Sequence, residues 1–340
     1  MTHQELPSYD TPPAGALRFN SDSGKLEYYN GEVWWQIDNF SADNATGGAR
    51  GLFGGGSSPN PNMSYVTIST TGNSISFGNF LDSTNTQSTA CSSSTRGVYC
   101  GGIVSPYSDA SITNVIQYIT ISSTGNAQDF GDLSIRSRYS SACSNSTRGL
   151  IITGDDGVSN YNTIEYITIA STGDAKDFGD MSRTTYSLSG ACSSSTRGVI
   201  GSGSPLVNTI EYVTISTAGN TQDFGDLTVA RSSATGSSSN AVRGLFAGGI
   251  TPAVTNVIDY ITISTTGNAI DFGDSTRSTT QMSSCSSSTR ALFGGGYTAP
   301  VLYNIIDYVT IMSTGNAVDF GDLLNPPYSA SACSNGHGGL

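Results

Sequence analysis

The stretch TIEYITIASTGDAKDFGD, residues 163–180, carries the phrase around which the chain is organised. Its last four residues, Asp-Phe-Gly-Asp, recur around Phe130, Phe178, Phe224, Phe272 and Phe320, and a weaker copy surrounds Phe77. Successive phenylalanines lie 53, 48, 46, 48 and 48 residues apart. This regular spacing indicates a repeat architecture of six units.

Each unit is predicted to hold four short strands. Residues 163–169 are β-branched and aromatic, as in a strand covered on both faces, and the strand at 177–180 follows a turn. A small-residue strand at 189–194 comes next, and then a strand that opens on an arginine. Those arginines are Arg50, Arg96, Arg148, Arg197, Arg243 and Arg290. Four strands per unit predict an all-β, six-bladed β-propeller over residues 49–340, since a β-helix has shorter coils and sandwich domains have about 100 residues.

The phase of the repeat predicts how the propeller closes. The first unit begins on its second strand, at Arg50, and the chain ends with an additional first strand at 329–334. We therefore expect the C-terminal strand to complete the N-terminal unit, which leaves no open strand edge between first and last blades.

The repeats resemble the kelch family, whose units carry a Gly pair after the second strand, a tyrosine on the third and a large aromatic on the fourth. Here phenylalanine replaces the usual tryptophan, and the Gly pair is reduced to Thr153-Gly154 and Ser202-Gly203 in two units. The resemblance implies the fold and says little about activity, because propellers serve many functions. The structural tyrosines are Tyr65, Tyr118, Tyr166, Tyr212, Tyr260 and Tyr308.

Composition excludes several classes of function. The 340 residues carry a formal charge of −12, which disfavours nucleic acid and anionic membranes as partners. No apolar run approaches 18 residues, and the first residues have neither a basic start nor an apolar stretch, so we expect no membrane span and no signal peptide.

Residues 1–40 lie outside the repeat and are predicted to form three short strands, joined to the propeller by a linker at 41–48. Such a sheet is too small to be stable alone, so it needs a partner surface. This stretch resembles a short module of tailed-bacteriophage fibre and other virion proteins, and the repeats resemble virion structural proteins of marine phages. The resemblance implies a virion protein assembled in the host cytoplasm, a homo-oligomer with a trimer as one arrangement, and attachment to other virion proteins. The predicted attachment residues are Phe19, Tyr28, Tyr29, Trp34 and Trp35.

The sequence offers little for catalysis. The two histidines, His3 and His337, lie near opposite ends of the chain, and no Ser-His-Asp set or phosphate-binding loop is recognisable. We therefore expect no enzyme activity, no catalytic residue and no cofactor.

Two repeated residue types, cysteine and aspartate, are possible ligands of a metal ion. One cysteine occupies the same place in five units and a serine the sixth, yet no Cys-x-x-Cys spacing accompanies them, so packing is the favoured interpretation and a thiol-metal ring the alternative. The paired aspartates of the Asp-Phe-Gly-Asp phrases suit hydrogen bonding in turns better than calcium, which stays the alternative. The five cysteines and the serine are Cys91, Cys143, Cys192, Cys285, Cys333 and Ser238.

The units differ most in the connections between strands two and three and between strand four and the next unit. Both connections leave a four-stranded meander on the same side, which predicts a recognition face on a rigid scaffold. We expect a tail-fibre or appendage-type virion protein that binds the host surface, a glycan or a protein, without catalysis. The alternative is a decoration or connector protein of the capsid or tail. The candidate binding residues are Pro106, Tyr107, Tyr139, Asp155, Asp156, Tyr186, Pro205, Leu206, Tyr297, Pro300, Tyr303 and Tyr328.

Overall fold

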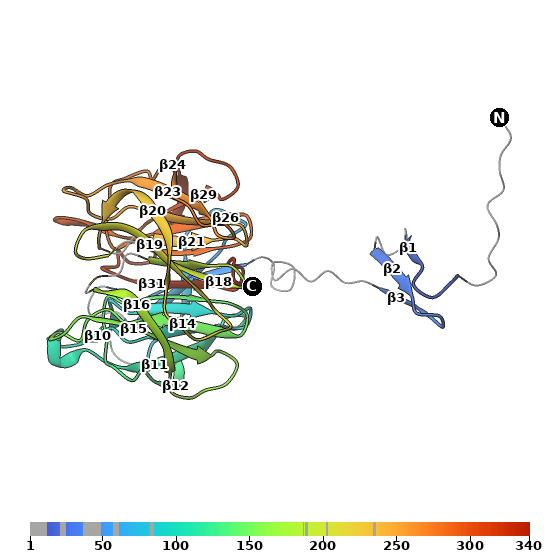
Figure 1. Ribbon diagram of the computed structural model, residues 1–340, viewed down its shortest axis with the longest axis horizontal. Helices are drawn as coiled ribbons and strands as arrows, with labels where there is room; N and C mark the ends of the chain where they lie inside the picture. The colour runs from blue at the N-terminus through green and yellow to red at the C-terminus, as the bar shows by residue number, and fades with distance from the viewer. Residues whose placement is uncertain are drawn as a thin grey trace.

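The computed structural model describes residues 12–20, 25–36, 49–56, 61–81, 85–185, 187, 190–201, 203–233 and 236–340. These residues form β-strands and one short 3-10 helix, η1 (Asp109–Ser111) (Figure 1). No helix in the described ranges is long and apolar enough to cross a membrane. The predicted linker at 41–48 lies outside the described residues.

Six antiparallel sheets of four strands make up residues 49–340, and we number them sheets 1 to 6. In strand order, sheet 1 is β31 (Ser331–Ser334), β4 (Arg50–Gly54), β5 (Asn62–Thr67) and β6 (Ile75–Asn79); sheet 2 is β8 (Thr89–Ser92), β9 (Arg96–Cys100), β11 (Val115–Thr120) and β12 (Gln128–Asp132); sheet 3 is β13 (Ser141–Ser144), β14 (Arg148–Ile152), β15 (Tyr161–Thr168) and β16 (Lys176–Thr185). Sheet 4 is β17 (Gly190–Ser193), β18 (Arg197–Gly201), β19 (Val207–Thr214) and β20 (Gln222–Arg231); sheet 5 is β21 (Gly236–Ser239), β22 (Arg243–Ala247), β23 (Val257–Thr262) and β24 (Ile270–Asp274); sheet 6 is β25 (Ser283–Ser286), β26 (Arg290–Gly294), β29 (Ile305–Thr310) and β30 (Val318–Asp322). The prediction of four strands per unit is confirmed.

The two ends of the repeat region meet in sheet 1. The C-terminal strand β31 pairs antiparallel with β4, so that Ser331 lies opposite Gly54 and Ser334 opposite Gly51. The predicted pairing of the last strand with the first unit is therefore confirmed.

The apolar core is divided into six clusters, and each cluster lies between two consecutive sheets. Between sheets 3 and 4, for example, Leu150 and Phe178 pack with Ile200 and Val213. Equivalent clusters join sheets 1 and 2, 2 and 3, 4 and 5, 5 and 6, and 6 and 1. Because sheet 6 packs on sheet 1 in this way, the contacts between neighbouring sheets form a cycle.

A series of serine hydrogen bonds follows the same cycle along the first strand of each sheet, which is β31, β8, β13, β17, β21 or β25. We call this series the serine ring. Ser144 Oγ donates to the carbonyl oxygen of Ser92 at 2.7 Å, and Ser193 Oγ donates to that of Ser144. The last member, Ser334 Oγ, donates to the carbonyl oxygen of Ser286, and Ser92 Oγ donates to that of Ser334. With Ser239 completing the series, six hydroxyls and six carbonyl groups are paired without a break.

The repeated arginines connect neighbouring sheets on the outer side of the core. Arg148 donates from Nη1 to the carbonyl oxygen of Ile215 in sheet 4 at 3.0 Å, and its guanidinium lies 4.5 Å from the Tyr166 ring centroid. Tyr166 in turn meets Phe178 edge-on. The repeated arginines therefore have a structural role, in which each one braces a turn of the next sheet.

The Asp-Phe-Gly-Asp phrase shapes the outer strand for contact with the next sheet. Gly219 N donates to the carbonyl oxygen of Phe178 at 2.7 Å, and Asp180 N donates to Asn220 Oδ1 at 3.0 Å. A Cβ on Gly179, whose φ is +146°, would lie 2.5 Å from the Gly219 backbone, so only glycine fits there. Each outer edge is thereby covered by a turn of its neighbour, which limits edge-to-edge aggregation.

The N-terminal residues form a separate three-stranded sheet of β1 (Leu17–Asn20), β2 (Lys25–Tyr29) and β3 (Trp34–Gln36) (Figure 1). Asn30 Oδ1 accepts hydrogen bonds from the backbone N–H groups of Glu32 and Val33, and Gly31 has a φ of +106°. These contacts form the tight turn predicted from Asn30-Gly31.

Candidate functional site

The connections on the variable side of sheets 6, 1 and 2 surround a hollow of about 570 Å³, which we call the loop hollow. It brings together four predicted binding residues, Tyr107, Tyr297, Pro300 and Tyr328. Two of these connections carry short extra ladders, β7 (Asn85–Thr86) with β10 (Ile103–Val104) and β27 (Tyr297–Thr298) with β28 (Val301–Leu302). The remaining lining residues are Gly56, Thr86, Gln87, Ile103, Arg138 and Leu302.

Tyrosines contact one another beside the loop hollow. The Tyr297 and Tyr328 rings meet edge-on, with centroids 5.5 Å apart. Tyr328 Oη also lies 3.3 Å from Gln281 Nε2 and is hydrogen-bonded to Tyr139. Burial, followed by the neighbouring Tyr328, raises the pKa of Tyr139 to about 12, so this hydroxyl stays protonated and available to donate.

Arg138 is the one charged side chain among the described residues that line the loop hollow. Its Nε lies 2.9 Å from Asp155 Oδ1, and its Nη1 lies 3.0 Å from Asp109 Oδ1. Two carboxylates therefore pair with this guanidinium, and the other lining side chains offer hydroxyl groups, an amide and ring surfaces. Asp155 is buried and holds Arg138 in place.

The other predicted binding residues lie elsewhere or in local contacts. Asp156 caps its own turn through Val158 N and Ser159 N, hydrogen bonds that lower the pKa of its carboxyl. Tyr303 stacks under Arg277, which pairs with Asp307. Pro106, Pro205 and Leu206 are exposed but do not line the loop hollow, and Tyr186 lies outside the described residues.

A second pocket, the central pocket, lies between the first strands of the six sheets. Four residues with a left-handed backbone conformation lie at its outer end, and we call them the rim. Gln87, Tyr139, Gln281 and Ser329 have φ values of 59°, 52°, 58° and 56°, two residues before the first strand of their sheets. Their backbones are linked: Gln87 N donates to the carbonyl oxygen of Ser329, and Tyr139 N donates to that of Gln87. Non-glycine residues adopt this conformation at a cost, and such residues concentrate at functional sites. The sequence carries no clear signal for this rim.

The pocket continues inward between the six first strands. Its outer part is lined by the rim and its inner part by the serine ring, and both parts share one small residue from each sheet. The Gln87 and Gln281 side-chain oxygens are buried near the rim without a hydrogen-bond partner among the described residues. The shared residues are Ala90, Ala142, Ala191, Ser237, Ser284 and Ala332.

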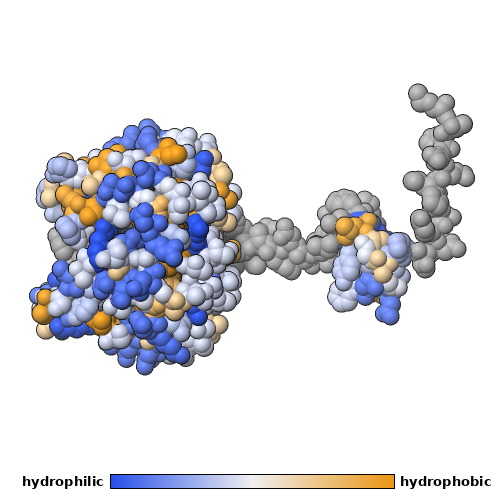
Figure 2. All heavy atoms as spheres, in the orientation of Figure 1, coloured by the Kyte–Doolittle hydropathy of each residue, from blue (hydrophilic) through white to orange (hydrophobic). Residues whose placement is uncertain are grey.

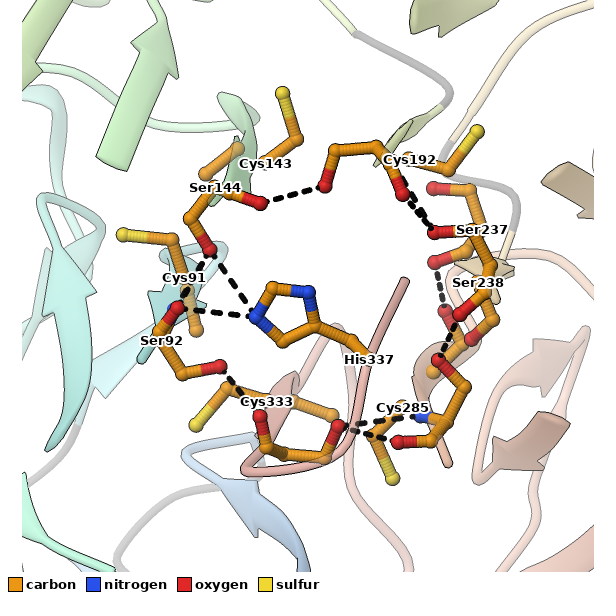
Figure 3. A pocket seen from close by; sticks show the side chains of 18 of the residues that line it. Cys91, Ser92, Cys143, Ser144, Cys192, Ser237, Ser238, Cys285, Cys333 and His337 are labelled. Atoms are coloured by element: carbon orange, nitrogen blue, oxygen red, sulfur yellow. Dashed lines mark hydrogen bonds between the residues drawn. The ribbon is translucent and has the colours of Figure 1, made fainter. Parts of the chain in front are cut away.

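His337 closes the inner end of the pocket, as Figure 3 shows. Its Nε2 lies 3.0 Å from the carbonyl oxygen of Ser92, and its Nδ1 accepts a hydrogen bond from Gly339 N at 3.1 Å. The acceptor role of Nδ1 assigns the proton to Nε2 of a neutral ring. Burial lowers the pKa of His337, which agrees with that assignment.

The cysteines surround this pocket, but their sulfur atoms point away from its centre (Figure 3). All six cysteines are buried and free, and burial raises the pKa of Cys143 to about 12. A Cβ added to Gly198 of sheet 4 would lie 2.8 Å from Cys143 Sγ. The thiols therefore fill space between sheets, as the packing interpretation expects.

Neither metal interpretation gains a ligand set. In the part of the chain that the structure describes, no three His, Cys, Asp or Glu side chains gather closely enough to hold a metal ion. The Asp-Phe-Gly-Asp aspartates lie on the outer strands, where their backbone groups bond to turns of neighbouring sheets.

The predicted attachment residues of the N-terminal sheet fall on two faces. Tyr28 and Trp35 are 40% and 55% exposed, and the register places them opposite each other. Tyr29 and Trp34 form a second pair, with ring centroids 5.3 Å apart. Phe19 lies opposite Leu26.

A scan of the sequence against protein-family models finds no match, and a search of curated protein sequences finds none either.

Proposed function

We propose that the six sheets are the blades of a β-propeller that β31 closes. Four observations support this: six apolar clusters join consecutive sheets in a cycle, the serine hydrogen bonds return to their start, β31 pairs with β4, and first strands contact each other in cyclic order. In this arrangement the variable connections lie at one end of the central pocket, and His337 lies at the other.

Removal of residues 328–340 tests the closure. The deletion takes away β31, the Ser334 hydrogen bonds and His337, and it exposes the inner edge of β4. We expect the cooperative thermal unfolding of residues 49–340 to shift down by more than 10 °C or to vanish, because an unclosed propeller loses contacts at both ends of the cycle. An unchanged, cooperative transition would contradict the proposal.

We further propose that the chain is a phage virion structural protein that binds the host surface without catalysis. The virion assignment rests on the resemblance of residues 1–40 and of the repeats to virion proteins. The binding role rests on one observation above all: connections from three neighbouring sheets gather tyrosines and a proline around a hollow whose one charged lining residue among the described residues, Arg138, is ion-paired. Tyrosine ring faces and Gln amides suit a neutral glycan, since they offer stacking surface and hydrogen bonds together.

Binding of the purified chain to susceptible cells tests this role. A variant with Tyr107→Ala and Tyr297→Ala removes two walls of the loop hollow, and we expect cell binding to fall at least tenfold. Leu206→Ala, on the same side but away from the hollow, is the control and should bind as the unmodified chain does. Equal binding by all three proteins would refute the role of the hollow.

The alternative, a connector within the particle, makes a different prediction about exposure. Electron cryomicroscopy of the particle should show the loop hollow open to solvent if the protein binds hosts. A hollow covered by capsid or tail subunits would instead assign these loops to assembly.

A further inference from the structure

The loop hollow and the central pocket adjoin along three segments of the chain. Gln87 lines both of them. Arg138 and Tyr328 line the hollow, and the residues that follow them, Tyr139 and Ser329, line the outer part of the central pocket. A ligand held in the hollow therefore has the pocket directly beside it.

Three of the four rim residues, Gln87, Tyr139 and Ser329, lie where the chain passes from one cavity to the other. Gln87 N donates to the carbonyl oxygen of Ser329 at 3.0 Å, and Tyr139 N donates to that of Gln87 at the same distance. Thr86 Oγ1 donates to the carbonyl oxygen of Tyr328 at 2.8 Å. Left-handed residues of this kind persist only where the surrounding structure holds them, and they concentrate at functional sites. The edge between the two cavities is therefore fixed before any ligand binds.

The outer part of the central pocket is polar and uncharged. No Asp, Glu, Lys or Arg occurs among the described residues that line it. Ser237 Oγ donates to the carbonyl oxygen of Ala191 at 2.9 Å, and Ser284 Oγ donates to that of Ser237 at 2.7 Å, so both hydroxyl oxygens keep lone pairs for a donor. The other four sheets place an alanine methyl group at the same position. The pocket therefore has a hydroxyl side on sheets 5 and 6 and a methyl side on sheets 1 to 4.

Two amide side chains at the rim lack partners for their oxygen atoms. Gln87 Oε1 and Gln281 Oε1 are buried without a hydrogen-bond partner among the described residues. Both side chains line the outer part of the pocket, so rotation of either amide turns its oxygen toward a group bound there. A ligand hydroxyl that donates to this oxygen would recover the free energy that an unpaired buried acceptor costs.

The central pocket is blind at its inner end. His337 lies inside the serine ring (Figure 3), and Gly338 N donates to the carbonyl oxygen of Ser239 at 2.9 Å, which holds the C-terminal residues across this end. The outer part measures about 100 Å³ and the inner part about 60 Å³, against about 570 Å³ for the loop hollow. A single water needs about 10–15 Å³ of such a cavity. The pocket therefore has room for the hydroxyl-bearing end of one sugar unit, and a longer chain cannot pass through it.

We propose that the central pocket is the subsite for the terminal unit of a neutral glycan whose following units lie in the loop hollow, so that this face binds chain ends and not internal segments. The inference rests on the proposed function of the loop hollow and deepens it. A sugar unit carries hydroxyl groups around an apolar ring face, which matches the hydroxyl and methyl sides of the pocket. Figure 2 shows the side of the six sheets that carries β10, at left, as mixed hydrophobic and hydrophilic surface, which suits the same class of ligand.

Ala142→Leu tests the terminal subsite. Ala142 lines the central pocket and does not line the loop hollow, so a leucine there fills the pocket and leaves the walls of the hollow in place. We expect binding of the full chain to susceptible cells to fall about tenfold, because the terminal unit loses its contacts. Ala170→Leu makes the same substitution at an exposed turn of sheet 3 and is the matched control, which should bind as the unmodified chain does. Thermal unfolding of both variants checks that the fold is kept.

Competition provides a measurement that needs no variant. The probe is neutral polysaccharide purified from the surface of susceptible cells, used before and after partial acid hydrolysis, which multiplies chain ends at constant mass. If chain ends bind, the hydrolysate should inhibit cell binding of the unmodified chain at a lower mass concentration than the intact polysaccharide does. Inhibition that weakens as the chains shorten, or no inhibition by either form, would overturn the proposal.

The outcomes separate this inference from the proposed function. Loss of cell binding in the Tyr107 and Tyr297 variant, together with normal binding by Ala142→Leu, would keep the role of the loop hollow and overturn the terminal subsite. Normal binding by both variants would overturn both.

Discussion

Five of the six junctions between neighbouring sheets pack a cysteine against a glycine, and the sixth packs a serine against an alanine. In the five, a Cβ added to the glycine would lie 2.5–2.8 Å from the sulfur of the preceding sheet. In the sixth, Ser238 of sheet 5 stands where the others have cysteine, and Ala291 of sheet 6 stands where the others have glycine. The five glycines are Gly51, Gly97, Gly149, Gly198 and Gly244.

This difference indicates that the combined volume of the two facing side chains is kept nearly constant at each junction, while the residue types change. A smaller hydroxyl in place of the thiol leaves room for one additional methyl group across the junction, and close-packed interiors tolerate exchanges that keep the total volume. β21 and β26, which carry Ser238 and Ala291, contact each other as the corresponding strands of the other junctions do. The repeated phrases therefore vary in pairs where their side chains meet.

The largest effect is expected when a methyl group is added to a cysteine junction. In Gly149→Ala the new Cβ would lie 2.5 Å from Cys91 Sγ, and both sheets enclose the site. Overpacking of this kind costs about 1–3 kcal/mol, and we expect about 2 kcal/mol in the free energy of unfolding. Urea denaturation followed by circular dichroism measures it.

Gly125→Ala is the matched control, because nothing lies within 4 Å of an added Cβ there. Its free energy of unfolding should stay within about 0.5 kcal/mol of the unmodified protein, as for most surface substitutions. Equal losses in both variants would show that the thiol contact is unimportant.

A double-mutant cycle sharpens the comparison at the sixth junction. Ser238→Cys alone restores the thiol against Ala291 and should cost about 1 kcal/mol, since the removal of a buried, unpaired hydroxyl only partly offsets the cost of overpacking. Ala291→Gly alone should cost a similar amount through a void and added backbone freedom. The double variant rebuilds the junction found five times elsewhere and should match or exceed the unmodified stability. Additive losses in the cycle would refute compensation.

The unit boundaries, the strand order and the pairing of the last strand with the first unit follow from the sequence, because Phe130, Phe178 and their equivalents recur at a nearly constant interval. These features depend on the local residue pattern and on the strand at which the first unit begins, and a single sequence is enough to determine both. The position of Tyr139 beside Tyr328 is different: it joins connections far apart in the sequence whose paths depend on the packing of three sheets. No local pattern brings those two residues together.

Some readable signals were missed. Alternation along β3 places Trp34 and Trp35 on opposite faces of the sheet, a distinction that the prediction of attachment residues does not draw. The glycine that follows five of the six repeated arginines can be recognised as a repeat in the sequence, but its reason, the thiol of the preceding sheet, emerges only when the sheets are placed side by side. His337 lies near the end of the sequence and has no equivalent in the other units, so no pattern indicates that it lines the pocket among the repeated serines, where the structure places it.

The smallest effect is expected from this histidine, the one non-repeated side chain in an otherwise six-fold ring. The carbonyl oxygen of Ser92 accepts both the repeated hydrogen bond from Ser144 Oγ and the additional one from His337 Nε2. Because burial lowers the pKa of His337 in the folded state, the unfolded chain binds the proton more tightly. The contribution of His337 is therefore complete above its ordinary pKa of about 6.5 and is lost as the pH falls below it, by no more than about 1.4 kcal/mol per pH unit. The unfolding free energy measured at pH 7.5 and 5.5 should fall more in the unmodified chain than in His337→Gln. Parallel pH profiles would mean that the histidine only fills the pocket, and the contrast between repeated and non-repeated residues would then lie in packing alone.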